Sequence, residues 1–122
     1  IEALLGPEVR LPDGASLTIE PTRALVAVDV NTGPDTSPAA GLKASLGAVR
    51  ELPRQLRLRG LGGQVVIDFA PFPRRERQIL DQALAKVARA EPDALTLAGW
   101  TPLGLFELTR RRDRVPLAGW WR

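Results

Sequence analysis

The chain has 122 residues, a formal net charge of +3 and a sequence pI of about 10.5. It contains no cysteine and no histidine, which excludes disulfides, thiol nucleophiles, histidine bases and the usual zinc sites. A metal would need oxygen ligands, and a general base would have to be a carboxylate, a lysine or metal-bound water. The length and the 44% hydrophobic content predict one domain over residues 1–122, without a membrane segment and located in the cytoplasm.

The first third of the chain reads as a β meander over residues 8–31. Asp13-Gly14 separates two short runs of alternating apolar residues, and this dipeptide in such a position is a strong hairpin signal. A third strand is expected over residues 23–30. The N-terminal part should therefore contribute three antiparallel strands to a sheet.

The third predicted strand carries polar residues at its end. Successive residues of a strand point to opposite faces, so Asp29 and Asn31 should share one face while Val28 and Val30 share the other. A carboxylate directly within an apolar β run is costly unless a partner neutralises it. Asp29 is therefore a candidate ligand, and an unrelated surface residue is the alternative.

Residues 38–112 read as an alternation of helices and strands after a loop rich in Gly, Pro, Ser and Thr. Pro53 should kink or restart the first helix. In chain order we expect a helix over 42–58, a strand over 64–69, a helix over 74–90, a strand over 94–98 and a helix over 103–112. The order βββαβαβα predicts an α/β (α+β) fold, with a mixed sheet and helices packed on it. Residues 113–122 form a tail.

A second carboxylate, Asp68, lies near the end of the run 64–69, whose apolar composition predicts a strand buried on both faces. Ligands of such sheets bind beyond the carboxyl ends of the strands. Asp29 and Asp68, with the amide of Asn31, would form an oxygen-rich site of the kind that holds Mg²⁺. Magnesium held by carboxylates commonly serves to cut phosphodiester bonds. Asp29 and Asp68 are thus candidate metal ligands.

Arginine supplies all but two of the 17 basic residues, and guanidinium groups bind phosphate in a bidentate manner. The candidates for nucleic-acid contact are Arg54, Arg57 and Arg59, late in the first predicted helix, and Arg110 and Arg112 near the end of the last. Solvated helix faces, and a composition set by a GC-rich genome, are the alternatives.

Four runs of the chain, taken together and in this order, resemble the ribonuclease E/G family. They are Ala24–Gly33, Arg54–Gly63, Val65–Phe69 and Gly104–Arg112. The resemblance implies the catalytic subdomain that is similar to DNase I, with one Mg²⁺ on Asp29 and Asp68. It implies that Asn31 orients the attacking water or the scissile phosphate, so that Asp29, Asn31 and Asp68 are the catalytic residues. The implied reaction is endonucleolytic hydrolysis of single-stranded RNA, leaving a 5′-phosphate and a 3′-hydroxyl.

The chain also departs from the family pattern. Ala70-Pro71-Phe72 stands where the family commonly has a further acid, and the family's other domains are missing from the sequence. This leaves a homo-oligomer, or the missing domains of a longer parent chain, as candidate partners. A non-catalytic RNA-binding module is the alternative to a magnesium-dependent endoribonuclease. A structural or assembly domain that uses Trp120-Trp121 is a third hypothesis.

Overall fold

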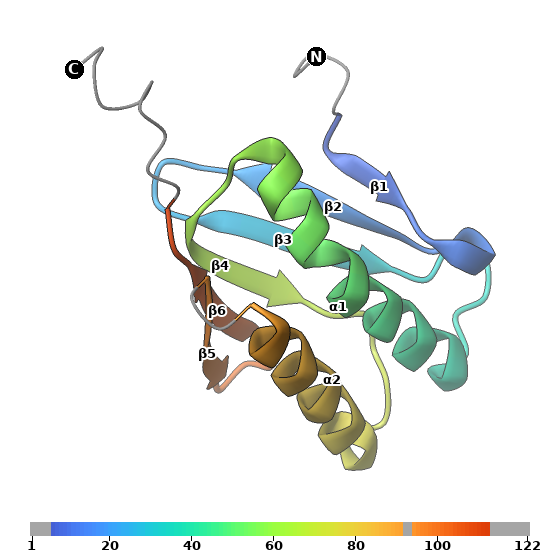
Figure 1. The fold of residues 1–122 in the computed structure, drawn as a ribbon. Coiled ribbons are helices and arrows are strands. Elements are labelled where there is room, and N and C mark those ends of the chain that lie inside the picture. Colours follow the sequence, from blue (N-terminus) through green and yellow to red (C-terminus); the bar gives the residue numbers. More distant parts are fainter. Residues whose placement is uncertain (1–5, 92–93, 113–122) are drawn as a thin grey trace, which may run out of the picture.

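The computed structural model describes residues 6–91 and 94–112, which form a mixed β-sheet with two helices. The sheet has six strands in the spatial order β1-β2-β3-β4-β6-β5. Figure 1 shows both helices on the same side of this sheet. The predicted α/β class, with a mixed sheet and helices packed on it, is confirmed. The strands are β1 (Glu8–Arg10), β2 (Ser16–Pro21), β3 (Val26–Asn31), β4 (Gly63–Asp68), β5 (Leu95–Trp100) and β6 (Phe106–Arg110), and the helices are α1 (Pro38–Arg59) and α2 (Arg77–Ala90).

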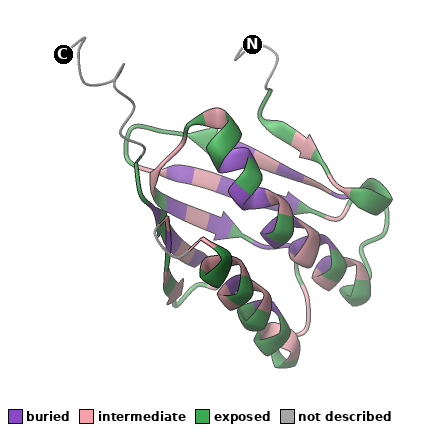
Figure 2. Ribbon diagram, in the orientation of Figure 1, coloured by how far each residue is buried: buried purple, intermediate pink, exposed green. Residues whose placement is uncertain are grey.

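Burial alternates along the central strands, as Figure 2 shows. In β3 the three valines are buried while Asp29 and Asn31 are exposed. In β4 the buried residues are Val65 and Ile67, whereas Asp68 is exposed. The expectation that residues 64–69 are buried on both faces was wrong, because both helices cover the same face of the sheet. The other face of the sheet carries the exposed carboxylates.

The N-terminal meander is confirmed, since β1 pairs with β2 and β2 with β3, both in antiparallel fashion. The turn between β1 and β2 is the short 3₁₀ segment η2 (Pro12–Gly14). Asp13 and Gly14 adopt positive φ angles of 64° and 79° there, which is the conformation that an Asp-Gly turn accommodates best.

Helix α1 connects β3 to β4 across the sheet. Ser37 caps its first turn by accepting a hydrogen bond from the backbone N–H of Ala40 at 3.2 Å, and Gly60 ends it in the left-handed conformation. The helix continues through Pro53, so the restart, which was one of the two predicted alternatives, does not occur. Pro53 and its neighbour Leu52 are buried, and this packing against the core offsets the lost backbone hydrogen bond.

The C-terminal part differs from the prediction in one element. Residues 103–112 were expected to form a helix, but β6 runs antiparallel to both β4 and β5. Phe106, Leu108 and Arg110 are its buried positions, a period of two that belongs to a strand. The observed order is therefore βββαβαββ. Helix α2 begins at Arg77, after a short 3₁₀ turn, η3 (Arg74–Glu76). The predicted tail 113–122, with Trp120 and Trp121, lies outside the described residues.

No helix in residues 6–91 and 94–112 combines the length and the apolar character that a membrane crossing requires.

Candidate active site

Two aspartates come together at one edge of the sheet. Strands β3 and β4 are parallel, and Asp29 is the register partner of Asp68 in their last pair. Both side chains are exposed on the face of the sheet opposite the helices. Two residues that are 39 positions apart in the sequence are therefore direct neighbours on adjacent strands, as a paired carboxylate site requires.

The connection through α1 explains this placement. The crossover through α1 returns the chain to the end of the sheet at which β3 begins. Strands β3 and β4 therefore run in the same direction and end at the same edge. The alternation of buried and exposed residues is the same in the two strands. Val28 pairs with Ile67 on the buried face, and Asp29 pairs with Asp68 on the exposed face. A shift of one residue in either strand would turn its carboxylate into the core.

The charges of this edge repel each other. Partial burial against the neighbouring strands raises the pKa of the Asp29 carboxyl above its ordinary value, and the negative charge of Asp68 raises it further. A hydrogen bond from the backbone N–H of Val30 lowers this pKa, and the charge of Glu20 raises it. Within residues 6–91 and 94–112, neither Asp29 nor Asp68 forms an ion pair with Lys or Arg. The pair therefore carries uncompensated negative charge.

A shallow cavity of about 270 Å³ surrounds the two carboxylates. Thr18 and Glu20 line it from β2, and Leu105 lines it from the turn before β6. In the described part of the chain, no group of three or more His, Cys, Asp or Glu side chains is placed to hold a metal ion. A bound ion would therefore have two protein carboxylates, and its remaining ligands would be water or substrate oxygens.

The residues present fit Mg²⁺. This ion is commonly held by one or two carboxylates together with substrate phosphates, and it retains several water molecules. Asp29 and Asp68 supply the hard oxygen ligands, and a cation between them would relieve the repulsion that raises the pKa of Asp29. Their lack of an arginine or lysine partner among the described residues leaves both carboxylates available for an ion.

Asn31 lies on the same face as Asp29, two residues further along β3. Because Asp29 is in the last pair of β3 with β4, Asn31 extends past the end of that pairing. The chain then leaves through Gly33, which has a φ of 85°. A side chain here would bring its Cβ within 2.3 Å of the Gly14 carbonyl oxygen. Glycine is thus required where the exit of β3 passes the β1–β2 turn.

The segment after Asp68 is anchored on α1. A Cβ on Gly41 would lie 1.7 Å from the carbonyl oxygen of Pro71, so the first turn of the helix touches this segment directly. The hydroxyl of Ser45, which is fully buried, lies 3.5 Å from the carbonyl oxygen of Ala70. Both contacts fix the backbone that follows the second carboxylate.

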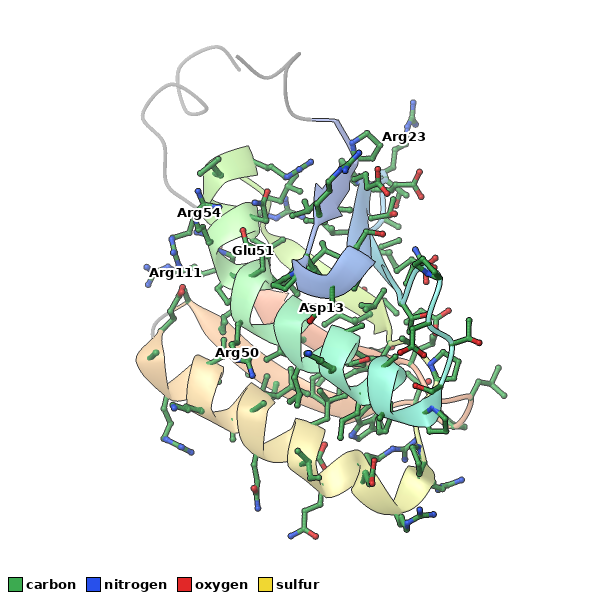
Figure 3. All side chains as sticks on the ribbon, turned by 90° about the vertical axis from the view of Figure 1, so that its right-hand side faces the viewer. Asp13, Arg23, Arg50, Glu51, Arg54 and Arg111 are labelled. Carbon is green, nitrogen blue, oxygen red and sulfur yellow. The ribbon has the colours of Figure 1, made fainter. Side chains whose placement is uncertain are left out.

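The predicted nucleic-acid contacts Arg54, Arg57 and Arg59 lie on the last turns of α1, toward the start of β4. Arg54 is exposed and pairs with Glu51 at 2.8 Å, and Figure 3 labels both side chains on α1. Arg57 forms an ion pair with Glu91. Arg59 donates hydrogen bonds to the Gln55 side chain and to the backbone oxygen of Gly6. The structure does not bring these arginines to the carboxylate edge.

The other two predicted contacts, Arg110 and Arg112, also lie at the starting end of β4. Arg110 is the register partner of Gly63, is only 5% exposed and donates to the carbonyl oxygen of Leu61 at 2.9 Å. Arg112 is exposed and lies against the backbone of Gly62 and Gly63, where a Cβ on Gly63 would be 2.6 Å from its guanidinium nitrogen. Arg110 is thus placed to support the fold rather than to meet a ligand.

Sequence reasoning overlooked the arginines that lie near the carboxylate edge. Arg74 and Arg77 line a cavity of about 570 Å³ together with Trp100, and the guanidinium carbon of Arg77 is 4.2 Å from the centroid of the Trp100 ring. The sequence signal was the position of Arg74 and Arg77 soon after Asp68 in the chain. Both cavities lie at the end of the sheet where β4 ends.

The comparisons with known proteins bear on this site. The profile of the Ribonuclease E/G family matches residues 1–113. The chain is 40% identical over 118 residues to ribonuclease E of Nostoc sp. (strain PCC 7120) and 37% identical over 118 residues to ribonuclease E of Escherichia coli (strain K12). It is 33% identical over 121 residues to a chloroplastic ribonuclease E/G-like protein of Arabidopsis thaliana.

These matches cover 93%, 92% and 93% of this chain but only 17%, 11% and 12% of the relatives. The chain thus spans less than a fifth of the length of each of these proteins. The profile match extends across nearly the whole chain and includes both strand-end aspartates. The chain belongs to the ribonuclease E/G family.

Proposed function

We propose that this chain is the core of a magnesium-dependent endoribonuclease that cleaves single-stranded RNA to give 5′-phosphate products. One observation carries the proposal: in a chain of this family, Asp29 and Asp68 are register partners at the carboxyl ends of adjacent parallel strands. No lysine or arginine among the described residues forms an ion pair with them. The names of the relatives, which are ribonucleases, support RNA as the substrate.

In the proposed mechanism, the carboxylates of Asp29 and Asp68 would hold the Mg²⁺ ion. When bound, the ion supplies a Lewis acid that offsets charge on the phosphate and favours ionised water near neutral pH. Asn31 positions a reactant through its amide, whose N–H can donate to a phosphate oxygen and whose carbonyl can accept from water. The water oxygen bonds to phosphorus and releases a proton to solvent, the bond from phosphorus to O3′ breaks, and O3′ takes up a proton from solvent. The phosphate therefore stays on the downstream fragment.

The test uses the full 122-residue chain and a 3′-labelled single-stranded RNA oligonucleotide. We expect cleavage with Mg²⁺ and none with EDTA. Asp29→Asn and Asp68→Asn should each reduce the rate by about 10³-fold or more, because one carboxylate holds the ion poorly. Mass spectrometry should find a 5′-phosphate on the downstream product, and a 2′,3′-cyclic phosphate on the upstream product would contradict attack by water.

Asp13→Asn is the matched control for these substitutions. Asp13 is exposed, has a φ of 64° and pairs with Lys43. Asparagine tolerates this left-handed conformation well, so the variant changes the same functional group without disturbing the turn. It should cleave at the rate of the unchanged protein. Equal cleavage by Asp68→Asn and Asp13→Asn would overturn the proposal.

A second candidate function is RNA binding without cleavage. It is favoured by the absence, in the described residues, of a third carboxylate placed to hold a metal ion with Asp29 and Asp68; Ala70 follows Phe69 in the chain. This function predicts RNA affinity that falls steeply with salt and needs no magnesium. Binding in EDTA without any cleavage in Mg²⁺ would favour it over the nuclease.

We treat residues 1–122 as one domain, because strands from the meander and from the later part pair in a single sheet. We place the reaction in the cytoplasm, since the chain has no cysteine to oxidise.

The exposed Arg54, Arg57 and Arg112 are proposed to contact a more distant stretch of the same RNA, or another domain of a longer parent chain.

A further inference from the structure

The larger cavity lies at the same end of β4 as the carboxylate site, on the side of the sheet that carries α2. Phe69 lines this cavity of about 570 Å³, while Asp68, the preceding residue, lines the smaller cavity around the aspartates. The same division recurs across the sheet, where Gly104 lines the larger cavity and Leu105 the smaller one. Consecutive Cα atoms are about 3.8 Å apart. Because successive side chains point to opposite faces, the two cavities lie on opposite sides of the edge at which β4 ends, and their linings meet at that edge.

The charged residues of the larger cavity are all positive. Arg74 and Arg77 line it, and no Asp or Glu does so within the described parts of the chain. Neither arginine takes part in an ion pair among those residues. Guanidinium groups without a carboxylate partner can bind phosphate in a bidentate manner. The cavity thus has the charge that complements a phosphodiester.

The aromatic side of the cavity is held rigidly. The indole Nε1–H of Trp100 donates to the Asp81 carboxylate at 2.6 Å. Its ring centroid lies 5.7 Å from that of Phe69 and 5.1 Å from that of Phe106. Arg77 packs over the indole with its guanidinium carbon 4.2 Å from the ring centroid, which orients the charged group before any ligand arrives.

The rim of the cavity is apolar and exposed. Leu103, in the turn between β5 and β6, is 93% exposed, although it is a large aliphatic residue. Phe72 lines the cavity from the segment after β4 and is only partly buried. Apolar side chains beside cationic ones match a nucleotide, whose base is flat and apolar on its faces and whose phosphate is anionic.

We infer that this cavity binds one nucleotide of the single-stranded RNA, at the same end of β4 as the scissile phosphate. Arg74 and Arg77 hold its phosphate, and Phe72 and Leu103 contact its base. This inference rests on the proposed function, because the carboxylate pair at this end of β4 defines which phosphate is cut. The cavity thereby sets where the RNA lies relative to Asp68.

The test measures the affinity of the full chain for a fluorescein-labelled single-stranded RNA by anisotropy, in EDTA so that no cleavage occurs. Arg74→Gln with Arg77→Gln should weaken binding by about tenfold at low salt. It should also reduce the slope of log affinity against log salt by about 1.4, or about 0.7 for each lost phosphate contact to a single strand. Arg75 is a neighbouring exposed arginine that does not line the cavity, so Arg75→Gln is the matched control. It should reduce the affinity and the salt slope less than the double change does.

Leu103→Ser separates the base contact from the charge contact. Its side chain is exposed, so the change should leave the fold intact, lower the affinity by about threefold and leave the salt slope unchanged. If Arg77→Gln impairs folding through the loss of its contact with Trp100, Arg74→Gln and Leu103→Ser still decide the question. Equal affinities for Arg74→Gln, Leu103→Ser and the unchanged chain would overturn the inference.

The two proposals fail in different ways. Unchanged RNA affinity in the cavity variants, with cleavage still dependent on Asp68, would remove the nucleotide site and leave the nuclease. Weakened affinity in the cavity variants, with no cleavage by the unchanged chain in Mg²⁺, would remove the nuclease and leave an RNA-binding cavity.

Discussion

The two ends of strands β3 and β4 differ in the sign of their charged residues and in whether those residues have partners within the protein. At the carboxyl end, Asp29 and Asp68 lie side by side without an ion pair among the described residues. At the other end, roughly 17 Å away for a six-residue strand, charged groups are largely engaged within the protein. Arg57 pairs with Glu91, and Arg110 donates to Leu61.

This difference separates charge that maintains the fold from charge that is available to a ligand. The arginine-rich runs are the most conspicuous basic features of the sequence, yet they lie at the end remote from the carboxylates. Arg74 and Arg77, which sequence reasoning did not select, lie beside the carboxylate edge. The register of the two central strands therefore locates the site better than local charge density does.

The largest expected effect concerns how the carboxyl end is anchored. Gly41→Ala would place a Cβ 1.7 Å from the Pro71 carbonyl oxygen. Either α1 or the segment that follows β4 must then move. We expect a loss of about 3 kcal/mol in the free energy of unfolding, measured with urea. Gly47→Ala is the control in the same helix, where the nearest atom to the new Cβ is 4.0 Å away. It should be neutral or stabilise by up to about 1 kcal/mol, and equal effects of the two changes would show that the contact is unimportant.

The next effect tests the structural role of the basic end. Arg110→Met removes the donor to the Leu61 carbonyl from a residue that is 5% exposed. We expect it to lower the free energy of unfolding by about 2 kcal/mol, because a partly buried acceptor loses its partner. Arg111→Met, at an exposed position, should change stability by less than about 0.5 kcal/mol. A stable Arg110→Met variant with impaired RNA binding would instead assign Arg110 to the ligand.

Much of the carboxyl end could be predicted from the sequence. Alternation along two apolar runs predicts which side chains share a face, and a helical crossover brings the ends of both runs to one edge. The juxtaposition of Asp29 and Asp68 follows from these two rules alone. Their metal binding remains a prediction, since the geometry of the pair supports it without testing it.

The basic end could not be predicted in the same way. Arg57 meets Glu91 and Arg59 meets Gly6 across 34 and 53 residues, and such contacts depend on the complete tertiary fold. Residues 103–112, which contain β6, were expected to form a helix. The arginines after Arg110 resemble a helix C-terminus. Pairing with both β4 and β5 decided in favour of a strand.

A moderate effect is expected from magnesium itself. An ion that binds the folded chain but not the unfolded one should stabilise it by about 1.4 kcal/mol at ten times its dissociation constant. The measurement is thermal unfolding with MgCl₂ against NaCl of equal ionic strength, and it does not depend on catalysis. Asp68→Asn should abolish the specific gain, whereas Asp13→Asn should retain it. A gain that persists in Asp68→Asn would place the ion elsewhere.

The smallest effect comes from the partial burial of the Asp29 carboxylate and its repulsion by Asp68 when no metal is present. The raised pKa of Asp29 means that the folded chain binds this proton more tightly than the unfolded chain does. Below the unfolded value of 3.8 the group is neutral in both states, and its unfavourable charge appears only as pH rises through the folded pKa. Asp29→Asn should therefore stabilise the chain at pH 7 in EDTA by roughly a few tenths of a kcal/mol, since solvent screens an exposed pair, and the gain should vanish near pH 3.

Asp13→Asn gives the comparison of opposite sign. Asp13 forms an ion pair with Lys43 at 2.8 Å. Asp13→Asn removes this favourable charge pair, so it should not raise the free energy of unfolding. A difference in sign between the two variants at pH 7 would show that Asp29 faces net negative charge. If Asp29→Asn destabilised the chain in EDTA, a nearby cation would already neutralise the carboxylate. The edge would then be a structural ion pair, and Mg²⁺ would have to displace that cation before it could bind.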